Sequence, residues 1–306
     1  MNAKKIKKIV VLATGGTIAG QASDPAKSEN YTAGQLGVGE LLQGMAVDGL
    51  ELVTEQVAQI DSKDMSFAIW QNLLGRVAHW VVQEHVQGVV ITHGTDTLEE
   101  TAYFLQTVLQ PAKPVALTCA MLPANAPDSD GPGNLKDALA WVQRADAKGV
   151  VVVCASQVHA GHAVQKSHSH QRNPFTSQDK VMHPEHLHVP SVAKVLACQQ
   201  WPRVELLLNH AGADGRHVRT LMAHDAPQGW VAAGTGNGTL HHALEAALLD
   251  AQKQGAYVLR ASRCAQGGVQ SREADVLPHA GALTAVQARV ALLLHLIAQP
   301  SPQIQS

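Results

Sequence analysis

The stretch that decides the fold is Ile9-Val10-Val11-Leu12-Ala13-Thr14-Gly15-Gly16-Thr17-Ile18-Ala19-Gly20. Its five leading apolar residues are typical of a strand that is buried on both faces, and the glycine pair ends that strand in a loop. In open α/β sheets, ligands bind beyond the carboxyl ends of the strands, which is where Thr14 to Gly20 lies. Gly15 and Gly16 permit positive φ and let the backbone approach a bound molecule closely. Thr17 adds a hydroxyl, so the loop carries a candidate nucleophile.

Length and composition indicate a globular protein of about two domains, because 306 residues at roughly 150 per domain give that number. A hydrophobic fraction of 45% is enough for two cores. The formal net charge of −2 provides no basic surface for nucleic acid. No apolar run reaches the roughly 18 residues that span a bilayer. We therefore expect neither a nucleic-acid partner nor a membrane partner.

The cysteines and the beginning of the chain favour a cytoplasmic protein. The apolar segment near the start, residues 9–13, is shorter than the roughly 7–15 residues of a secretory signal. The cysteines sit singly in apolar runs without C-x-x-C spacing, which is typical of buried, reduced thiols. They are Cys119, Cys154, Cys198 and Cys264.

Strand and helix patterns alternate through the first part of the chain. Strands are expected at residues 9–13, 50–57, 88–92, 114–118 and 149–155. Helices are expected at residues 32–45, from Asp61 or Ser62 as cap to about 85, at 98–109 and at 134–145. This alternation predicts a mostly parallel sheet with helices on both faces.

The second part of the chain predicts a smaller α/β domain. Residues 158–190 are rich in histidine and lack a period, so we expect hairpins and loops there. Strands are expected at 204–210, 229–233 and 256–261, and helices at 238–254 and 284–298, the last capped by Thr284. We expect a larger N-terminal catalytic domain over residues 1–190, a linker over 191–212 and a smaller C-terminal domain over 213–306.

A second stretch, Ile91-Thr92-His93-Gly94-Thr95-Asp96-Thr97, repeats the order of strand, glycine and threonine. Thr17 and Thr95 then lie at the ends of two strands of one sheet. Asp96 adds a carboxylate beside the second hydroxyl. A carboxylate at the start of a helix is often only a cap. Its pairing with a second glycine-threonine loop favours a catalytic constellation.

These two stretches carry a resemblance to a known family. The first family signature is matched by Ala13-Thr14-Gly15-Gly16-Thr17-Ile18-Ala19, and the second by Thr92-His93-Gly94-Thr95-Asp96-Thr97-Leu98-Glu99-Glu100-Thr101-Ala102. The sequence resembles the bacterial L-asparaginase and glutaminase-asparaginase family, closest to its type II-like members. The resemblance extends over nearly the whole chain and is weakest in the histidine-rich middle. Its further matches are Asn30–Thr32, Asp61–Met65, Ala120–Met121, Asp130–Leu135, Gly236–Gly238 and Ser262–Arg263.

The resemblance implies hydrolysis of L-asparagine to L-aspartate and ammonia through a threonine acyl-enzyme, without a cofactor. Thr17 is implied as the nucleophile, with Tyr31 beside it. Thr95, Asp96 and Lys166 are implied as a second catalytic set. An alcohol needs a base to take its proton, and a buried lysine can serve through Thr95 or a water.

The resemblance also implies how the substrate binds. Ser62 and Asp96 would hold the α-carboxylate and α-amino groups, and the carbonyl of Ala120 would receive the side-chain amide. The backbone N–H of Thr95 would face the developing oxyanion. The full set of implied binding residues is Gly16, Ser62, Lys63, Thr95, Asp96, Ala120, Asn237, Thr239 and Asp275.

The family implies a homotetramer, built as a dimer of dimers, in which part of one copy completes a neighbour's site. The segment at Asn237–Thr239 and an acidic residue within 272–275 would make these contacts. The match slips by one residue there, so both Glu273 and Asp275 remain possible.

The chain departs from the family at several positions. Lys63 replaces a glutamine of several periplasmic members, which puts an extra cation beside the expected carboxylate site. Thr239 replaces an asparagine, and this shorter side chain predicts weak glutaminase activity. The cysteine pair of some periplasmic members has no counterpart, which agrees with a reducing compartment.

Three alternatives stay open. A glutaminase-asparaginase of broad specificity is the nearest to the main interpretation. A metal-binding protein is the second, because histidine is a common ligand, although the spacings differ from those of closed zinc sites. The histidines concerned are His159, His162, His168, His170, His183, His186 and His188. The third is a nucleotide-binding domain that uses Thr14 to Gly20 for phosphate.

Overall fold

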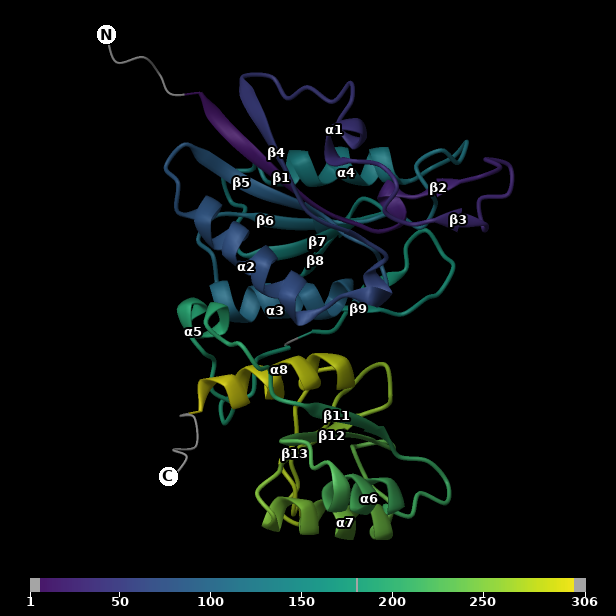
Figure 1. Ribbon diagram of the computed structural model, residues 1–306, viewed down its shortest axis with the longest axis vertical. Helices are drawn as coiled ribbons and strands as arrows, with labels where there is room; N and C mark the ends of the chain where they lie inside the picture. The colour runs from purple at the N-terminus through teal and green to yellow at the C-terminus, as the bar shows by residue number, and fades with distance from the viewer. Residues whose placement is uncertain (1–5, 180, 300–306) are drawn as a thin grey trace. The chain divides into compact units, whose positions relative to one another are not determined.

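The structure, a computed structural model, describes residues 6–179 and 181–299. The described residues divide into two compact units, the first ending at Ser177 and the second beginning at Gln178. Each unit consists of a mostly parallel sheet covered by helices (Figure 1). The predicted fold class, a larger and a smaller α/β unit, is confirmed. None of the helices described here combines the length and the apolar character that crossing a membrane requires.

The sheet of unit 1 places the first glycine-threonine loop next to the second. Within the described residues, six strands form it in the order β4-β1-β5-β6-β7-β8. The first five run parallel, and β8 runs antiparallel to β7. The strands are β1 Lys7–Gly15, β4 Leu50–Ile60, β5 Val86–Thr92, β6 Val115–Thr118, β7 Val150–Cys154 and β8 Gln157–Ala160.

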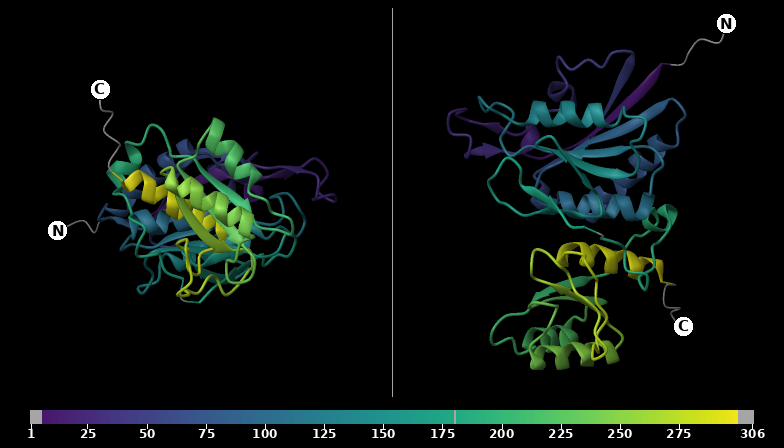
Figure 2. Two further views of the ribbon diagram at one scale, coloured as in Figure 1. Left: turned by 90° about the horizontal axis from the view of Figure 1, so that it is seen from below. Right: turned by 180° about the vertical axis from the view of Figure 1, so that it is seen from behind.

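Helices cover both faces of this sheet (Figures 1 and 2). On one face, α1 Val38–Leu41 and α4 Gly131–Trp141 form a hydrophobic core with the side chains that β1, β5, β6 and β7 direct toward them. On the other face lie α2 Phe67–Val81 and α3 Leu98–Leu109. The inner strands are buried on both sides, as their continuous apolar runs predicted.

Short elements carry residues beyond the edge of the sheet. Two 3₁₀ turns, η1 Thr17–Ala19 and η2 Ser62–Asp64, follow β1 and β4 directly. A small hairpin pairs β2 Gln21–Ala22 with β3 Tyr31–Thr32. An antiparallel ribbon pairs β9 Val164–Lys166 with β10 Phe175–Ser177.

The predicted helix over 32–45 is wrong. Thr32 belongs to β3, and the helical part is limited to the four residues of α1. Gly34 has a φ of +64°, a left-handed conformation that a helix excludes. The next helix is also capped differently. The side chain of Ser66 caps α2 by accepting from Ile69 N, whereas Asp61 caps η2 by accepting from Lys63 N.

Unit 2 is built on a smaller parallel sheet with the order β11-β12-β13 in its described part. α6 and α7 pack on one face around Trp230, and α8 packs on the other (Figure 1). Thr284 caps α8 as predicted, in a capping box with Gln287. The elements are α5 Val192–Leu196, β11 Val204–Leu208, α6 Arg216–His224, β12 Gly229–Gly234, α7 His242–Lys253, β13 Tyr257–Ser262 and α8 Ala285–Ala298.

The stretch 191–212, expected to be a linker, contains α5 and β11. β11 pairs with β12 along its whole length, so it is part of the sheet of unit 2. The structure changes from one unit to the other between Ser177 and Gln178. The sequence predicts this boundary later, at residue 190.

Candidate active site

The loops that follow four neighbouring strands carry most of the predicted site. Ser62 follows β4, Thr17 follows β1, Thr95 follows β5 and Ala120 follows β6. Because β4, β1, β5 and β6 are parallel and adjacent in the sheet, their carboxyl ends lie along one edge. The topology therefore brings these four residues to the position where α/β sheets bind ligands.

Glycines let the two threonine loops pack backbone against backbone. A Cβ on Gly16 would lie 2.3 Å from the backbone N of Gly94, and Gly16 has a φ of +81°. A Cβ on Gly94 would lie 2.5 Å from Ser62 Oγ. The ends of β1 and β5 are also joined by a hydrogen bond, in which Thr14 Oγ1 donates to the carbonyl of Thr92 at 2.9 Å. The three loops consequently form one closely packed unit.

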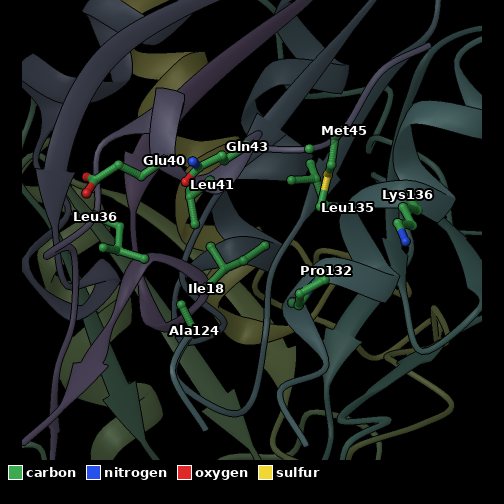
Figure 3. A pocket seen from close by; sticks show the side chains of 12 residues that line it. Ile18, Leu36, Glu40, Leu41, Gln43, Met45, Ala124, Pro132, Leu135 and Lys136 are labelled. Carbon is green, nitrogen blue, oxygen red and sulfur yellow. The ribbon is translucent and has the colours of Figure 1, made fainter. Parts of the chain in front are cut away.

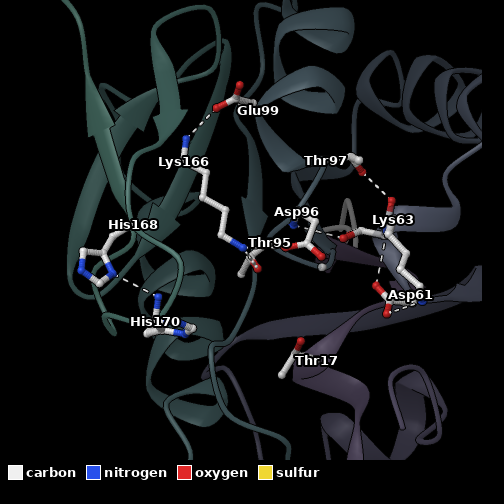
Figure 4. Close-up of polar contacts among 12 residues, drawn as sticks. Thr17, Asp61, Lys63, Thr95, Asp96, Thr97, Glu99, Lys166, His168 and His170 are labelled. Carbon is white, nitrogen blue, oxygen red and sulfur yellow. Dashed lines mark hydrogen bonds and ion pairs between the residues drawn. The ribbon is translucent and has the colours of Figure 1, made fainter. Parts of the chain in front are cut away.

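Thr17 is positioned by η1 and by the small hairpin. Thr17 is buried, and its Oγ1 lies 2.7 Å from Tyr31 Oη in a hydrogen bond. Tyr31 comes from β3 and is exposed. In Figure 4, the hydroxyl of Thr17 points in the direction of Thr95 and Asp96. The first predicted pair is thus brought together.

Lys166 joins Thr95 and Asp96 through its ammonium group (Figure 4). Its Nζ donates to Thr95 Oγ1 at 2.8 Å and to Asp96 Oδ1 at 2.6 Å. The side chain of Lys166 is 19% exposed, whereas that of Asp96 is 53% exposed. The lysine therefore lies inside the site, and the carboxylate keeps a surface that faces solvent.

Ser62 is fixed between its own loop and the start of α3. Its Oγ accepts a hydrogen bond from Asp96 N at 3.2 Å, and its carbonyl accepts one from Thr97 Oγ1 at 2.8 Å. The side chain is buried, with a relative exposure of 2%. This geometry places the Ser62 hydroxyl beside the Asp96 backbone, at the edge of the second threonine loop.

Lys63, next to Ser62, is paired with two carboxylates of its own turn. Its Nζ lies 2.7 Å from Asp61 Oδ2 and 3.3 Å from Asp64 Oδ2. The hydrogen bond to Asp61 raises the pKa of Lys63 above its ordinary value. The extra cation expected from the sequence is therefore neutralised locally, although 62% of the side chain remains exposed to solvent.

A polar network built on the partly buried Asp130 and the buried Asn134 holds the chain around Ala120. The carboxylate of Asp130 accepts hydrogen bonds from Met121 N and Leu122 N. Asn134 Nδ2 donates to the carbonyl of Cys119 at 3.0 Å. The loop after β6 is therefore pinned on both sides of Ala120. Asp130 and Asn134 belong to a matched segment of the sequence, but their hydrogen bonds could not be derived from it.

His93 supports the second loop from behind and was not singled out by sequence reasoning. It is fully buried; its Nδ1 donates to the carbonyl of Gly94 at 2.7 Å, and its Nε2 accepts from Thr101 Oγ1 at 3.0 Å. Trp70 Nε1 donates in turn to Thr101 Oγ1. Burial lowers the pKa of His93 to about 4, against an opposing effect of the Gly94 hydrogen bond. This histidine is neutral near pH 7.

Glu99 is a second residue whose contact the sequence did not reveal. It lies in the first turn of α3, where a carboxylate suits the positive end of the helix dipole. Its side chain is buried, however, and its Oε2 accepts a hydrogen bond of 2.6 Å from Lys166 N. Glu99 thus contacts the backbone of the lysine that Thr95 and Asp96 contact at the other end (Figure 4).

The remaining predicted residues lie in unit 2, at the carboxyl end of β12 and after β13. Asn237 Nδ2 donates to the carbonyl of Gln270, and its Oδ1 accepts from Gln270 N, so the amide closes a turn. Thr239 is exposed, and its hydroxyl hydrogen-bonds with Thr235. The turn after β12 and the segment after β13 are therefore joined through Asn237.

Asp275 and Glu273 differ in their surroundings. Asp275 Oδ2 lies 2.9 Å from the guanidinium of Arg260 and accepts from Arg272 N at 3.0 Å. These two hydrogen bonds, the one from Arg272 first, lower the pKa of Asp275. Glu273 is exposed on the same segment.

A separate pocket of about 480 Å³ opens in unit 1 (Figure 3). Ile18, the neighbour of Thr17, contributes to its lining, but the predicted site residues do not. The lining is mostly apolar and comprises Ile18, Leu36, Glu40, Leu41, Gln43, Gly44, Met45, Ala124, Gly131, Pro132, Leu135 and Lys136.

Two alternative interpretations gain no support from the structure. Residues 17–19 form a single 3₁₀ turn that leads into β2, so the Thr14–Gly20 loop lacks the following helix whose N-terminus would bind phosphate. Over residues 6–179 and 181–299, no group of three or more histidine, cysteine, aspartate or glutamate side chains is arranged to hold a metal ion. Several of the histidines instead hydrogen-bond to neighbouring backbone or hydroxyl groups.

The fold and the site define a class: an α/β protein with two hydroxyl groups, a lysine and a carboxylate at the carboxyl edge of its larger sheet. Comparison with known proteins specifies the class further. The family described as Asparaginase, N-terminal matches residues 8–186, and the glutaminase/asparaginase C-terminal domain matches residues 203–305. The chain belongs to the asparaginase family.

Individual relatives agree with this membership. The chain is 34% identical to L-asparaginase 2 of Escherichia coli (strain K12), over 97% of this chain and 91% of that protein. It is 34% identical to the glutaminase-asparaginase of Pseudomonas fluorescens biotype A, over 89% of this chain and 79% of that protein. A solved structure, the probable cytoplasmic L-asparaginase from Campylobacter jejuni, has a TM-score of 0.84 and 33% identity, with 97% of each chain covered. A relative from Haemophilus influenzae is named a probable periplasmic L-asparaginase.

Proposed function

We propose that the protein hydrolyses L-asparagine to L-aspartate and ammonia, with Thr17 as the nucleophile. One observation carries the proposal. The loops of Thr17 and Thr95 pack against each other through Gly16 and Gly94, and Lys166 contacts the second hydroxyl. Membership of the asparaginase family and the names of the relatives support the same reaction.

In the first half of the reaction, Thr17 Oγ1 attacks the carbon of the side-chain amide. The C–N bond breaks, ammonia leaves and an ester between Thr17 and the aspartyl group remains. The hydroxyl proton needs an acceptor, because an alcohol is a weak nucleophile at neutral pH. Tyr31 Oη, at 2.7 Å, is the nearest polar partner for that proton and can relay it to the leaving nitrogen.

In the second half, water attacks the ester, releases L-aspartate and restores the Thr17 hydroxyl. The attacking water must lose a proton, and we assign the transfer of that proton to Thr95, Lys166 and Asp96. The lysine Nζ contacts both other residues, so a proton can pass along short hydrogen bonds. The backbone N–H of Thr95 would stabilise the negative charge that develops on the carbonyl oxygen.

Substrate binding follows from the charges around this edge of the sheet. The Asp96 carboxylate is half-exposed and suits the α-ammonium group, while Ser62 and its neighbouring N–H groups suit the α-carboxylate. Gly16 has no side chain, so the backbone there can approach the substrate closely. The carbonyl of Ala120 would accept a hydrogen bond from the NH₂ of the substrate's side-chain amide. Lys63 adds positive potential on the carboxylate side, weakened by its pairing with Asp61 and Asp64.

We propose that glutamine is a poor substrate. Thr239 is shorter than the asparagine that the family resemblance implies at this position, and its hydroxyl is hydrogen-bonded to Thr235. Asn237 is likewise committed to Gln270. A broad glutaminase-asparaginase is the alternative, and the Pseudomonas fluorescens relative carries that name. Ammonia release with each substrate in parallel decides between them: comparable kcat/KM values would contradict our proposal.

The assembly and the compartment are also proposals. A homotetramer, built as a dimer of dimers, would let residues of unit 2 complete a neighbouring copy's site, and light scattering of the purified protein would measure its mass. We propose a cytoplasmic location because the four cysteines are free thiols and because the Campylobacter jejuni relative is named a probable cytoplasmic L-asparaginase. The periplasmic relative argues the other way, so fractionation of cells that express the tagged chain is the test.

Two substitutions test the proposed chemistry. Thr17→Ala removes the nucleophile, so we expect no acyl-enzyme and no ammonia release above background. Thr32→Ala, on the same hairpin as Tyr31, is the matched control and should retain wild-type turnover. A normal rate of ammonia release from Thr17→Ala would reject the assignment.

Lys166→Met removes the proposed proton carrier while keeping much of the side-chain volume. We expect turnover to fall by roughly 10²–10⁴-fold, the usual range for a general acid–base residue. Lys136→Met, an exposed lysine of α4, serves as the control. Steady-state ammonia release measures both, and unchanged turnover in Lys166→Met would remove this residue from the mechanism.

A further inference from the structure

The placement of Lys166 poses a physical problem. It ends β9, a strand of three residues that pairs with β10 and lies outside the sheet of unit 1. A lysine side chain also has four rotatable bonds and loses much conformational entropy when it is fixed. A short ribbon by itself gives weak control over where such an ammonium group points. Another element must set the position of the residue.

The start of α3 supplies that control. Within five residues of one another, three side chains contact Lys166: Thr95 and Asp96 accept from its Nζ, and Glu99 accepts from its backbone N at 2.6 Å. The lysine is therefore held at both ends by a single short stretch of chain (Figure 4). Thr95 and Asp96 lie in the loop just before α3 and Glu99 lies in its first turn, so the short path of the chain from Thr95 to Glu99 sets the distance between these two sets of contacts.

The burial of Glu99 shows that this contact is more than a favourable charge at the helix start. Its relative exposure is 8%, whereas a carboxylate that serves only the dipole can stay in water. Hydrogen bonds between a carboxylate and a backbone N–H are shorter and stronger than neutral ones. The bond from Lys166 N to Glu99 ties β9 to the helix that carries the second threonine loop.

We propose that Glu99 is a positioning residue that sets the place of the Lys166 ammonium against Thr95. The inference rests on the proposed function, since it assigns Lys166 a part in catalysis. Glu99 acts through the lysine backbone and does not itself touch the substrate. A small displacement of a catalytic group lowers the rate of the chemical step strongly, by as much as about 10²-fold for 1 Å.

Two substitutions at one position separate the hydrogen bond from the charge. Glu99→Ala removes the acceptor, so we expect kcat to fall by about 10–100-fold while KM stays within about 3-fold. Glu99→Gln keeps an amide oxygen that can accept from Lys166 N, so we expect kcat within about 5-fold of wild type. Glu100→Gln, the adjacent carboxylate, is the control and should match wild type.

The kinetic outcomes that overturn the proposal are distinct. A merely structural role would lower the folded fraction, measured by circular dichroism, without changing kcat per folded molecule. Wild-type kcat in folded Glu99→Ala therefore contradicts the proposal. So does an equal loss of kcat in Glu99→Gln and Glu99→Ala, because that result assigns the effect to charge instead of position.

Hydrogen exchange gives a readout that does not depend on activity. A peptide covering residues 164–167 contains the Lys166 amide, which should exchange at least about tenfold faster in Glu99→Ala than in wild type or Glu99→Gln. Unchanged protection in Glu99→Ala would overturn the proposal. If the wild-type protein released no ammonia from asparagine, the proposed function would fail, while this exchange measurement would still decide whether Glu99 holds Lys166.

Discussion

Asp275 and Glu273 lie two positions apart, but their carboxylates have different surroundings. The carboxylate of Asp275 is engaged by the buried Arg260 and by Arg272 N, so it is committed to the interior of unit 2. Breaking such a pair leaves a buried guanidinium without its counter-charge, which is strongly unfavourable. Glu273 is exposed and is therefore the better candidate for a contact with a neighbouring copy.

A matched pair of substitutions tests this difference. We expect Asp275→Asn to lower the thermal unfolding midpoint while leaving kcat per folded molecule close to wild type. Glu273→Gln should show the reverse, with an unchanged midpoint and reduced ammonia release. Differential scanning calorimetry and steady-state kinetics measure the two properties. Reduced turnover with normal stability in Asp275→Asn would return the proposed role to Asp275.

The two hydroxyls of the site could be predicted from the residues alone, but the lysine could not. Thr17 and Thr95 each follow an apolar run and a glycine, a local pattern that a single sequence displays. Lys166 contacts Thr95 from 71 positions away, and no period in the chain connects them. Only the resemblance to a family pointed to Lys166. Glu99 belongs to the second motif, but nothing in the sequence indicates that it accepts a hydrogen bond from Lys166 N.

At the scale of elements, the packing of the two glycine-threonine loops leads to a direct prediction. Gly16→Ala places a Cβ about 2.3 Å from Gly94 N, a distance that the two backbones can only relieve by moving apart. Gly44→Ala carries a comparable positive φ, +76°, but its Cβ would meet no atom within 4 Å. The two variants share the conformational strain and differ in the contact.

We expect Gly44→Ala to lose about 1–2 kcal/mol of unfolding free energy, the usual strain of a left-handed alanine, and to keep its turnover. Gly16→Ala should lose at least about 100-fold in kcat, because separating the loops displaces the nucleophile from the second set. Denaturant unfolding and ammonia release provide the two measurements. Similar turnover in both variants would show that the loop contact is not needed for catalysis.

The elements that sequence patterns misplaced have identifiable physical causes. The expected helix over 32–45 contains an apolar spacing, but Gly34 adopts a left-handed conformation and Gly37 lies at the cap of a helix of only four residues. The helix α6 was missed because its mean composition is polar and only Val218 in it is buried. The long, mostly apolar segments of α3 and α8 were predicted nearly to the residue.

At the scale of the whole molecule, the alternation of strands and helices was sufficient to predict a mostly parallel sheet in the larger unit and an α/β pattern in the smaller one. The strand order β4-β1-β5-β6 was not accessible, because it depends on which buried faces pack together after long crossovers. That order nevertheless decides the site, since it makes the ends of β1 and β5 neighbours. The change of unit comes at Ser177 and not at residue 190, because the residues that follow the β9–β10 ribbon belong to unit 2, where His188 N donates to His295 Nδ1.

The burial of His93 predicts how the stability of the protein depends on pH. Burial lowers the pKa of His93 to about 4, below the ordinary value of 6.5. Between these two values the unfolded chain binds a proton that the folded protein does not, so stability is lost as pH falls from about 6.5 toward 4. At 1.36 kcal/mol per pKa unit, this histidine alone accounts for a loss of about 3 kcal/mol.

Denaturant unfolding at a series of pH values from 4 to 7.5, at fixed protein concentration, measures this dependence. His93→Gln has no ring to titrate, so we expect it to be less stable than wild type at pH 7 but to show a flatter decline toward acid. His224→Gln, an exposed histidine of α6, should keep the wild-type slope. Other histidines whose pKa burial lowers, such as His159 and His295, contribute in the same direction, so some slope should remain. An identical slope in wild type and His93→Gln would mean that the folded protein accepts the proton at His93 without penalty, and the buried hydrogen bonds behind the second threonine loop would then be weaker than their geometry indicates.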